Sequence, residues 1–308
     1  MRVDVRRTVG TLELDVAFDV GLDECVAGVG PNGAGKSTLV RALASPSAGV
    51  VFQDRLLFPH MTALRNVEFP LPRDRREEAF GWLLRLGVSD VAGLRPAALS
   101  GGQAARVALA RAMAPGPSVL LLDEPFAGVD AAARALLRKE IAAFAGPRLL
   151  VTHDPLDANA LASRVVVLEA GKVVQQGTPA DIAARPRSAY VAQLVGVNLL
   201  RGNASGLRID LGGAALATAE QAYGPVLAVV HPRAVALHAS PPGGTPRNVW
   251  PGRVEGLERL GDRVRVRVGG VVPLVAEVTP AAVADLGLAA GLEVWAAVKA
   301  TDVAVYPA

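Results

Sequence analysis

The chain has 308 residues, 51% of them hydrophobic and 20% charged, with a formal net charge of +3. This length suits two domains with sizeable cores, and the single cysteine, Cys25, excludes an intrachain disulfide and fits a reducing compartment. No dense basic run with interleaved aromatic residues occurs, so we expect no nucleic-acid partner. We also expect neither a signal sequence nor a membrane-spanning helix, which would need about 18 apolar residues.

Residues 30–38 read Gly-Pro-Asn-Gly-Ala-Gly-Lys-Ser-Thr and fit the P-loop pattern G-x-x-x-x-G-K-[ST]. Glycines let backbone N–H groups turn inward around phosphate oxygens, and the helix that follows adds its positive N-terminal end. We expect Lys36 to reach the β- and γ-phosphates of ATP and Ser37 to ligate Mg²⁺. The alternative is a glycine-rich turn before a helix. The predicted nucleotide contacts are Gly30, Pro31, Asn32, Gly33, Ala34, Gly35, Lys36, Ser37 and Thr38.

The segment that follows the P-loop is short, since only 17 positions separate Lys36 from Gln53. This length predicts a helix over residues 36–44, a turn over 45–49 and a strand over 50–52. A parallel crossover can therefore still close.

The run Val119–Leu122 is short, apolar and unalternating, which predicts a buried parallel strand. Asp123 at its end is a natural second ligand for Mg²⁺, and Glu124 is placed to activate a water as general base. An acidic turn after a core strand is the alternative, but the P-loop independently requires an acidic partner.

The sequence Leu99-Ser100-Gly101-Gly102-Gln103, just before a predicted helix, resembles the signature motif of ABC-type ATPases. The resemblance covers residues 1–196 and implies an α/β P-loop fold with a RecA-like core and a helical subdomain. It further implies that Ser100 and Gly102 contact the γ-phosphate of ATP held by the P-loop of a second copy, with Gly101 and Gln103 in the same nucleotide-binding motif. A helix N-terminus also suits an anion on physical grounds.

Three further residues resemble functional positions of the same family. Gln53 resembles the Q-loop glutamine that contacts Mg²⁺ and water, Asp130 the D-loop aspartate that crosses the dimer, and His153 the switch histidine that contacts the γ-phosphate. By the same resemblance, the apolar segment 56–61 would lie where a permease helix docks. Simple packing of the two subdomains is the alternative, and both can hold.

The chain departs from the family in two ways. The family stacks adenine on an early aromatic, but none stands near Val9, and Phe18 is the only aromatic before the P-loop. The short segment between Lys36 and Gln53 lacks an antiparallel hairpin on the adenine side. The chain is therefore either an ATPase that works with a smaller adenine-side subdomain, or one in which a deletion lowers the affinity for nucleotide.

The part after residue 196 is β-rich and contains a weak repeat, which predicts small barrels packed together. Residues 198–202 align with 248–252, and residues 228–235 align with 296–303. We therefore predict an ATPase domain over 1–196 and an all-β, OB-like domain over 197–308, with half-repeats at about 197–240 and 246–308.

The second half-repeat resembles the MOP/TOBE-type modules of molybdate importers and regulators. By that resemblance Thr245, Arg247 and Lys299 would line an oxyanion site, although a family serine falls on Ala282. The alternative is a purely structural barrel. Arg263, Arg265 and Arg267 alternate with valines, which predicts a strand with one basic face, either solvated or facing an anion.

The resemblance implies the ATPase subunit of an ABC importer of the molybdate or tungstate class, using ATP and Mg²⁺. Its partners would be a second copy, membrane permease subunits and indirectly a substrate-binding protein, at the cytoplasmic face of the membrane. Oxyanion binding to the tail would regulate transport. The alternatives are an importer of sulfate, iron, sugar or polyamine, an ABC ATPase acting on nucleic acid or ribosomes, and an oxyanion-binding module with a weakened ATPase.

Overall fold

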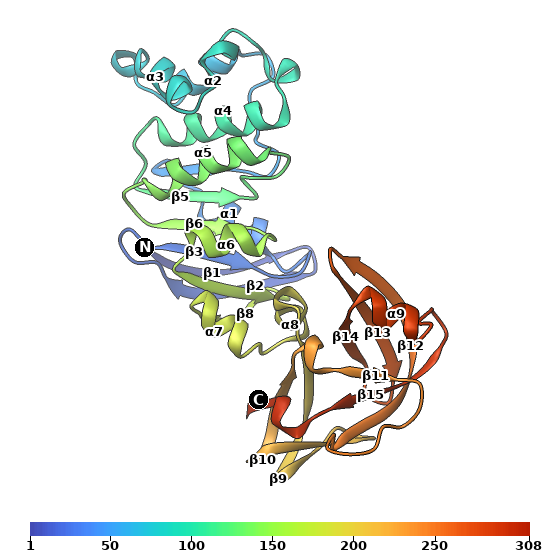
Figure 1. Cartoon of the computed structure of the whole chain (residues 1–308). Coiled ribbons are helices and arrows are strands. Elements are labelled where there is room, and N and C mark those ends of the chain that lie inside the picture. The colour runs from blue at the N-terminus through green and yellow to red at the C-terminus, as the bar shows by residue number, and fades with distance from the viewer. The chain divides into compact units, whose positions relative to one another are not determined.

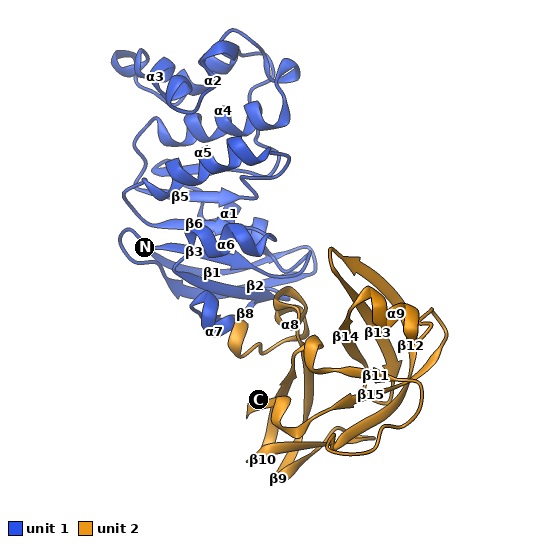
Figure 2. Ribbon diagram, viewed as in Figure 1, with its two compact units in different colours: residues 1–182 blue, residues 183–308 orange.

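The computed structural model describes all residues, 1–308, and divides into two compact units (Figures 1 and 2). The units comprise Met1–Ile182 and Ala183–Ala308. Helix α7 (Pro179–Ala184) spans this division, and helix α8 (Ala189–Val195) belongs to the second unit. The domain boundary at residue 196 stays a prediction. No helix is long and apolar enough to span a bilayer.

The first unit is built on a sheet of eight strands in the order β1-β2-β8-β7-β3-β6-β5-β4. Its strands are β1 (Arg2–Val9), β2 (Leu12–Asp19), β3 (Cys25–Val29), β4 (Ala48–Val51), β5 (Val119–Asp123), β6 (Arg148–Val151), β7 (Arg164–Glu169) and β8 (Lys172–Gly177). Its helices are α1 (Lys36–Leu43), α2 (Ala63–Glu68), α3 (Glu78–Arg85), α4 (Gly101–Met113), α5 (Ala131–Ala142) and α6 (Pro155–Leu161). Strands β3 and β4–β7 are parallel, and β1–β2 and β7–β8 pair antiparallel.

The buried centre of this sheet follows directly from the sequence. Strands β3, β5 and β6 are buried at every residue, as expected for apolar parallel strands that are covered on both faces. Helix α1 packs on the sheet through Leu39 and Val40, which are fully buried. The short segment after Lys36 holds helix α1, a turn and strand β4, which pairs with β5, so the predicted crossover is confirmed.

The second unit contains two antiparallel sheets, β16-β10-β9 and β11-β15-β12-β13-β14. Its strands are β9 (Asn198–Asp210), β10 (Ala215–Val230), β11 (Ala236–His238), β12 (Asn248–Leu260), β13 (Arg263–Gly270), β14 (Leu274–Val278), β15 (Glu293–Val298) and β16 (Val303–Pro307), and helix α9 spans Pro280–Asp285. Strand β11 of the first half-repeat pairs with β15 of the second, and β16 of the second pairs with β10 of the first. The half-repeats therefore exchange strands and are not two separate barrels.

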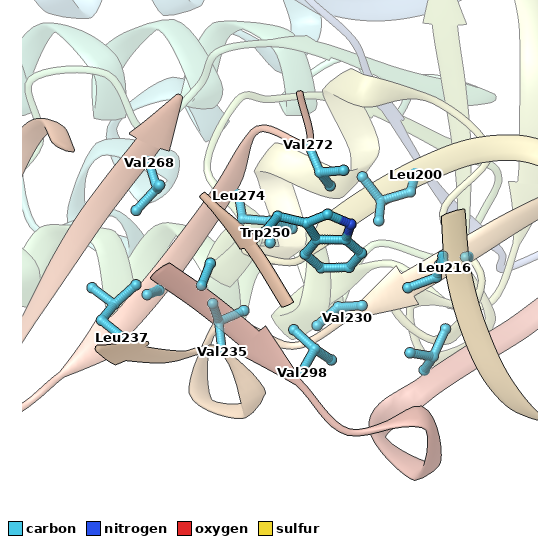
Figure 3. Close-up of a cluster of buried hydrophobic side chains, with 14 of the residues drawn as sticks. Leu200, Leu216, Val230, Val235, Leu237, Trp250, Val268, Val272, Leu274 and Val298 are labelled. Carbon is cyan, nitrogen blue, oxygen red and sulfur yellow. The ribbon is translucent and has the colours of Figure 1, made fainter. Parts of the chain in front are cut away.

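One hydrophobic core joins the two half-repeats. Trp250 on β12 is 8% exposed and belongs to a single cluster with residues of both halves. Figure 3 shows its indole between Leu200, Val230, Val272 and Val298. Because both halves contribute to this core, neither half buries its apolar face alone.

Candidate functional site

A cavity of about 510 Å³ lies at the carboxyl ends of the parallel strands in the first unit. Since such ends meet at one edge of a sheet, residues far apart in the chain converge there. The loop after β3, Gln53 after β4, the end of β5 and His153 after β6 all line the cavity. The lining residues are Leu12, Asn32, Gly33, Ala34, Gly35, Lys36, Ser37, Thr38, Gln53, Asp123, Glu124 and His153.

The loop of residues 30–35 has glycine where the backbone requires it. Gly35 has a φ of 100°, and a Cβ at Gly30 would lie 2.1 Å from the carbonyl oxygen of Leu168 on β7. The Nζ atom of Lys36 donates to the carbonyls of Gly30 at 2.7 Å and Pro31 at 2.9 Å. Burial lowers the pKa of Lys36. The loop is thus a cradle of backbone amides with one partly desolvated cation.

Asp123 is the buried acid of the cavity. Its side chain accepts a hydrogen bond from Ser37, while its Oδ1 atom is buried without any hydrogen-bond partner. Burial raises the pKa of Asp123, because the charged carboxylate loses water. A buried, unpaired carboxylate oxygen beside a serine hydroxyl is a donor set that suits Mg²⁺, so these residues fit the expected metal.

Glu124 stands next to Asp123 in a strained conformation. Its φ of 49° lies in the left-handed region, which is uncommon outside glycine. Its backbone N–H donates to the carbonyl of Val151 at 2.9 Å, and Oε1 lies 2.9 Å from Nδ1 of His153. The strained backbone and the histidine fix the direction of this carboxylate at the cavity.

The residues of the Ser-Gly-Gly-Gln motif lie at the start of α4, away from this cavity. The Ser100 side chain accepts a hydrogen bond from the Gln103 N–H at 3.2 Å, and Gln103 Oε1 accepts one from the Ser100 N–H at 2.8 Å. Ser100 and Gly101 are exposed, and Gly102 is buried. These two reciprocal hydrogen bonds form a capping box that orders the start of α4. None of the four motif residues lines the cavity of the same chain.

Asp130 caps the next helix, α5, and likewise does not line the cavity. Its Oδ1 accepts a hydrogen bond from the Ala133 N–H at 2.9 Å, and this bond lowers the pKa of Asp130. A Cβ on Gly102 would lie 3.5 Å from Asp130 Oδ2, so the starts of α4 and α5 adjoin. These two helix starts form one exposed edge.

Sequence reasoning missed the side chains that hold the segment after Gln53. The Arg55 guanidinium donates to the carbonyl of Ala127 at 2.6 Å, and Arg111 donates to the carbonyls of Arg55 at 2.8 Å and Leu56 at 2.7 Å. The buried amide of Asn66 also bonds both backbone groups of Phe58. No sequence pattern marks these contacts, because each joins positions brought together only by the fold.

A second cavity of about 380 Å³ adjoins the first and shares Ser37 and Thr38 with it. Its other lining residues are Arg7, Val9 and Arg41. Arg41 lies four positions after Ser37 on α1, so helical spacing could have placed it on the same face. Arg7 and Val9 share one face of β1 by strand alternation.

The residues expected to bind an oxyanion lie in the second unit. Arg247 precedes Asn248 and Lys299 follows Val298, and because Asn248 pairs with Val298, the two cations leave one end of the β12–β15 pair together. Thr245, Arg247 and Lys299 are all exposed. Ala282 lies in α9 and offers no side-chain donor there.

Both units are similar to known proteins. The profile of the ABC transporter family matches residues 44–127, and that of the TOBE domain matches residues 244–305. The molybdenum import ATP-binding protein ModC of Mycobacterium tuberculosis (strain H37Rv) is 38% identical over 361 residues, covering 100% of this chain and 98% of that protein. Because this alignment is longer than the chain of 308 residues, the relative has segments that this chain lacks.

Two further relatives are similar over most of the chain. The molybdate/tungstate import ATP-binding protein WtpC of Pyrococcus horikoshii is 32% identical over 333 residues, covering 95% of each chain. The sulfate/thiosulfate import ATP-binding protein CysA of Burkholderia pseudomallei is 37% identical over 294 residues, covering 82% of this chain and 83% of that protein.

The fold, the P-loop cavity and these similarities define an ABC-type ATPase, which couples ATP hydrolysis to transport. Within this class, the chain belongs to the family of ATP-binding subunits of ABC importers that carry a C-terminal TOBE domain.

Proposed function

We propose that this chain energises the import of molybdate or tungstate. The observation that carries the substrate class is similarity over the whole chain, including the β-rich unit, to proteins named for molybdenum and molybdate/tungstate import. The similarity to a sulfate/thiosulfate import protein covers less of the chain and keeps sulfate as a second candidate. Both candidates are tetrahedral oxyanions.

In this proposal the cavity binds the triphosphate of ATP. The backbone amides of residues 30–38 surround the phosphate oxygens, and Lys36 turns from the loop carbonyls towards the β- and γ-phosphates. Glu124 accepts a proton from the attacking water, and His153 holds the Glu124 carboxylate and contacts the γ-phosphate. Such positioning and charge neutralisation suit phosphoryl transfer, which needs little covalent chemistry from the protein.

Ser37, Asp123 and Gln53 would hold Mg²⁺ at this site, since they converge on one wall of the cavity. When bound, Mg²⁺ neutralises charge on the β- and γ-phosphates. Binding of Mg²⁺ by Oδ1 of Asp123 would explain why this buried oxygen has no hydrogen-bond partner in the protein.

We infer that the nucleoside lies in the adjoining cavity, between Arg7 and Arg41. This cavity contacts the P-loop at Ser37 and Thr38, so a nucleotide bound through its phosphates reaches it. A planar guanidinium can stack on a purine face, and such a stack would replace the aromatic ring that the chain lacks.

The proposed active unit is a dimer of two ATPase subunits. The edge formed by the starts of α4 and α5 exposes Ser100, Gly101 and Asp130, whereas Gln103 is half-buried and Gly102 is buried. None of the five lines the cavity of its own chain. In a two-fold dimer this edge would cover the cavity of the partner copy and present the N-terminus of α4 to the γ-phosphate.

The proposed docking surface for the membrane permease is a groove of about 700 Å³ beside the segment that follows Gln53. Leu56, Phe58 and Phe69 line it, and Leu56 and Phe69 are more than half exposed. An apolar groove of this kind suits a short helix of a partner. Docking there would place the subunit at the cytoplasmic face of the membrane. A substrate-binding protein would then act on the subunit only indirectly, through the permease.

We also propose that Thr245, Arg247 and Lys299 bind the transported oxyanion and regulate the ATPase. Guanidinium and ammonium groups that leave one strand end together suit a dianion. Millimolar molybdate should then slow ATP hydrolysis by the assembled transporter, and an R247Q/K299Q variant should resist it.

The main test is light scattering of the Glu124→Gln variant with and without Mg²⁺-ATP. A shift from monomer to dimer that depends on ATP supports the shared site, and Asp130→Ala should weaken this dimer. Absence of nucleotide binding at millimolar ATP would contradict the proposal and favour an oxyanion-binding module with a weakened ATPase. Transport assays with molybdate, tungstate and sulfate as competitors then decide the substrate.

A further inference from the structure

A separate cavity of about 310 Å³ lies within the second unit and has no part in the function proposed above. Helix α8, the start of β9 and the outer face of β12 and β13 enclose it. Its walls are mainly apolar, while Arg265, Arg267 and Glu258 are its charged residues. The apolar wall is formed by Ala189, Ala192, Val197, Leu199, Pro232 and Val275.

Of the three arginines on β13, Arg263 forms an ion pair, whereas Arg265 and Arg267 form none. Arg263 lies 2.7 Å from Oε1 of Glu277, and Arg233 lies 3.0 Å from the same oxygen. The hydrogen bond from Arg263 lowers the pKa of Glu277, so this acid is ionised and shared between Arg263 and Arg233. It lies opposite Arg265 in the pairing of β13 with β14, but forms no ion pair with it.

Arg265 and Arg267 have no carboxylate partner. Glu258 lies opposite Arg265 in the pairing of β12 with β13, yet no ion pair joins them. The Nε atom of Arg265 is buried and has no hydrogen-bond partner at all. An unmet buried donor is costly, and no protein group offsets this cost, while Arg265 itself lines the cavity, so its guanidinium is available to an anion there.

Two glycines make room for these guanidinium groups. A Cβ at Gly196 would lie 2.8 Å from Nη2 of Arg265, and a Cβ at Gly256 would lie 2.8 Å from Nη2 of Arg267. Any other residue at either glycine would push the guanidinium away. The absence of side chains at these glycines therefore lets both guanidinium groups lie against the backbone at the cavity.

We propose that this cavity binds a small organic monocarboxylate. Its carboxylate accepts hydrogen bonds from Arg265 and Arg267, whose planar groups match two carboxylate oxygens. Two arginines against Glu258 leave one net positive charge in the lining, which favours a monoanion over a dianionic phosphate or molybdate. The apolar wall contacts the rest of the ligand, and the volume is at the small end of ligand sites, roughly 300–1,000 Å³.

The test is isothermal titration calorimetry of the full chain with benzoate, hexanoate and acetate. Benzoate or hexanoate should bind, and acetate should bind about tenfold more weakly because it covers little of the apolar wall. The R265Q/R267Q variant should lose at least about tenfold in affinity for the better probe. The R247Q/K299Q variant, altered at the other cationic pair of this unit, should bind as the unaltered chain does.

The proposal is overturned if neither benzoate nor hexanoate binds at millimolar concentration, if acetate binds equally well, or if R265Q/R267Q leaves the affinity unchanged. Should the double variant fail to fold, Gly256→Ala provides an independent test. Its methyl group displaces only the flexible end of Arg267 and should weaken binding about threefold or more. Unchanged affinity in Gly256→Ala would then count against the site.

Discussion

The Nδ1 atom of His153 lies 2.9 Å from Oε1 of Glu124, and this contact joins the ends of two neighbouring strands, β6 and β5. The His153 side chain is 74% exposed, whereas that of Glu124 is 12% exposed. The histidine is therefore free to reach a ligand while it orients the more buried carboxylate.

Replacement of His153 by alanine should lower kcat for ATP hydrolysis about 100-fold, because the Glu124 carboxylate loses its orienting partner. The KM for ATP should change much less, since the P-loop that holds the phosphates is untouched. Steady-state kinetics of His153→Ala beside a His60→Ala control, altered outside the cavity, measures this. A kcat within twofold of the unaltered enzyme would contradict the assigned role.

Replacement of Asp123 by asparagine should abolish hydrolysis and at the same time stabilise the nucleotide-free protein. Burial raises the pKa of Asp123 above the ordinary value of an aspartate. The stabilisation that Asp123 gives the folded state is therefore fully present at a pH below the ordinary pKa, and it is lost as the pH rises through the raised pKa. At neutral pH the native state therefore holds an unfavourable charge, and asparagine removes it.

Thermal unfolding of Asp123→Asn without nucleotide should show a Tm a few degrees higher at pH 7, at about 2–4 °C per kcal/mol. The gain should shrink as the pH falls through the raised pKa and should vanish below the ordinary aspartate pKa of about 3.9, where both states of the unaltered chain bind the proton. A lower Tm at pH 7 would show that the carboxylate stabilises the apo protein instead.

Asn198 and Asn248 should each be needed for the stability of the second unit. Asn198 bonds the backbone N–H of Val275 at 2.7 Å and its carbonyl at 2.9 Å, and Asn248 bonds both backbone groups of Ala217 at 2.6 and 3.0 Å. Each amide thus ties the start of its own half-repeat to a strand of the other half.

Replacement of either asparagine by alanine leaves partly buried backbone groups unpaired and should cost roughly 1–3 kcal/mol in the free energy of unfolding. The exposed Asn203 on β9 is the matched control, and Asn203→Ala should stay within about 0.5 kcal/mol. Urea unfolding followed by tryptophan fluorescence in a Trp82→Phe background, which leaves only Trp250 and Trp295 of the second unit, reports this unit. Equal effects of all three substitutions would contradict the interpretation.

Arg55 should couple the segment after Gln53 to the segment before Asp130, through its bond to the Ala127 carbonyl at 2.6 Å. In the assembled transporter, Arg55→Ala should reduce stimulation of the ATPase by substrate-loaded binding protein about tenfold, while ATP affinity is unchanged. Arg76→Ala, altered at an exposed helix end, should keep full stimulation. Loss of nucleotide binding in Arg55→Ala would point to a general structural role instead.

The sequence by itself determined the features that depend on local spacing. The P-loop glycines, the apolar strand before Asp123 and Glu124, and the capping pair Ser100 and Gln103 each follow from neighbouring residues, because turn, strand and helix-cap geometry are short-range. The alternation of Arg263, Arg265 and Arg267 with valines likewise placed the valines in the core and the arginines on the outer face.

Only the tertiary structure decided which of these elements meet. The convergence of Gln53, Asp123 and His153 on one cavity depends on strand order, and the exchange of β11 and β16 between half-repeats depends on pairings between residues about 57 to 81 positions apart. The contact of Asn198 with Val275 and the unpaired state of Arg265 likewise depend on which strands meet in the fold. Long-range pairing reflects burial of a shared core rather than local conformational preference, so no short sequence pattern records it.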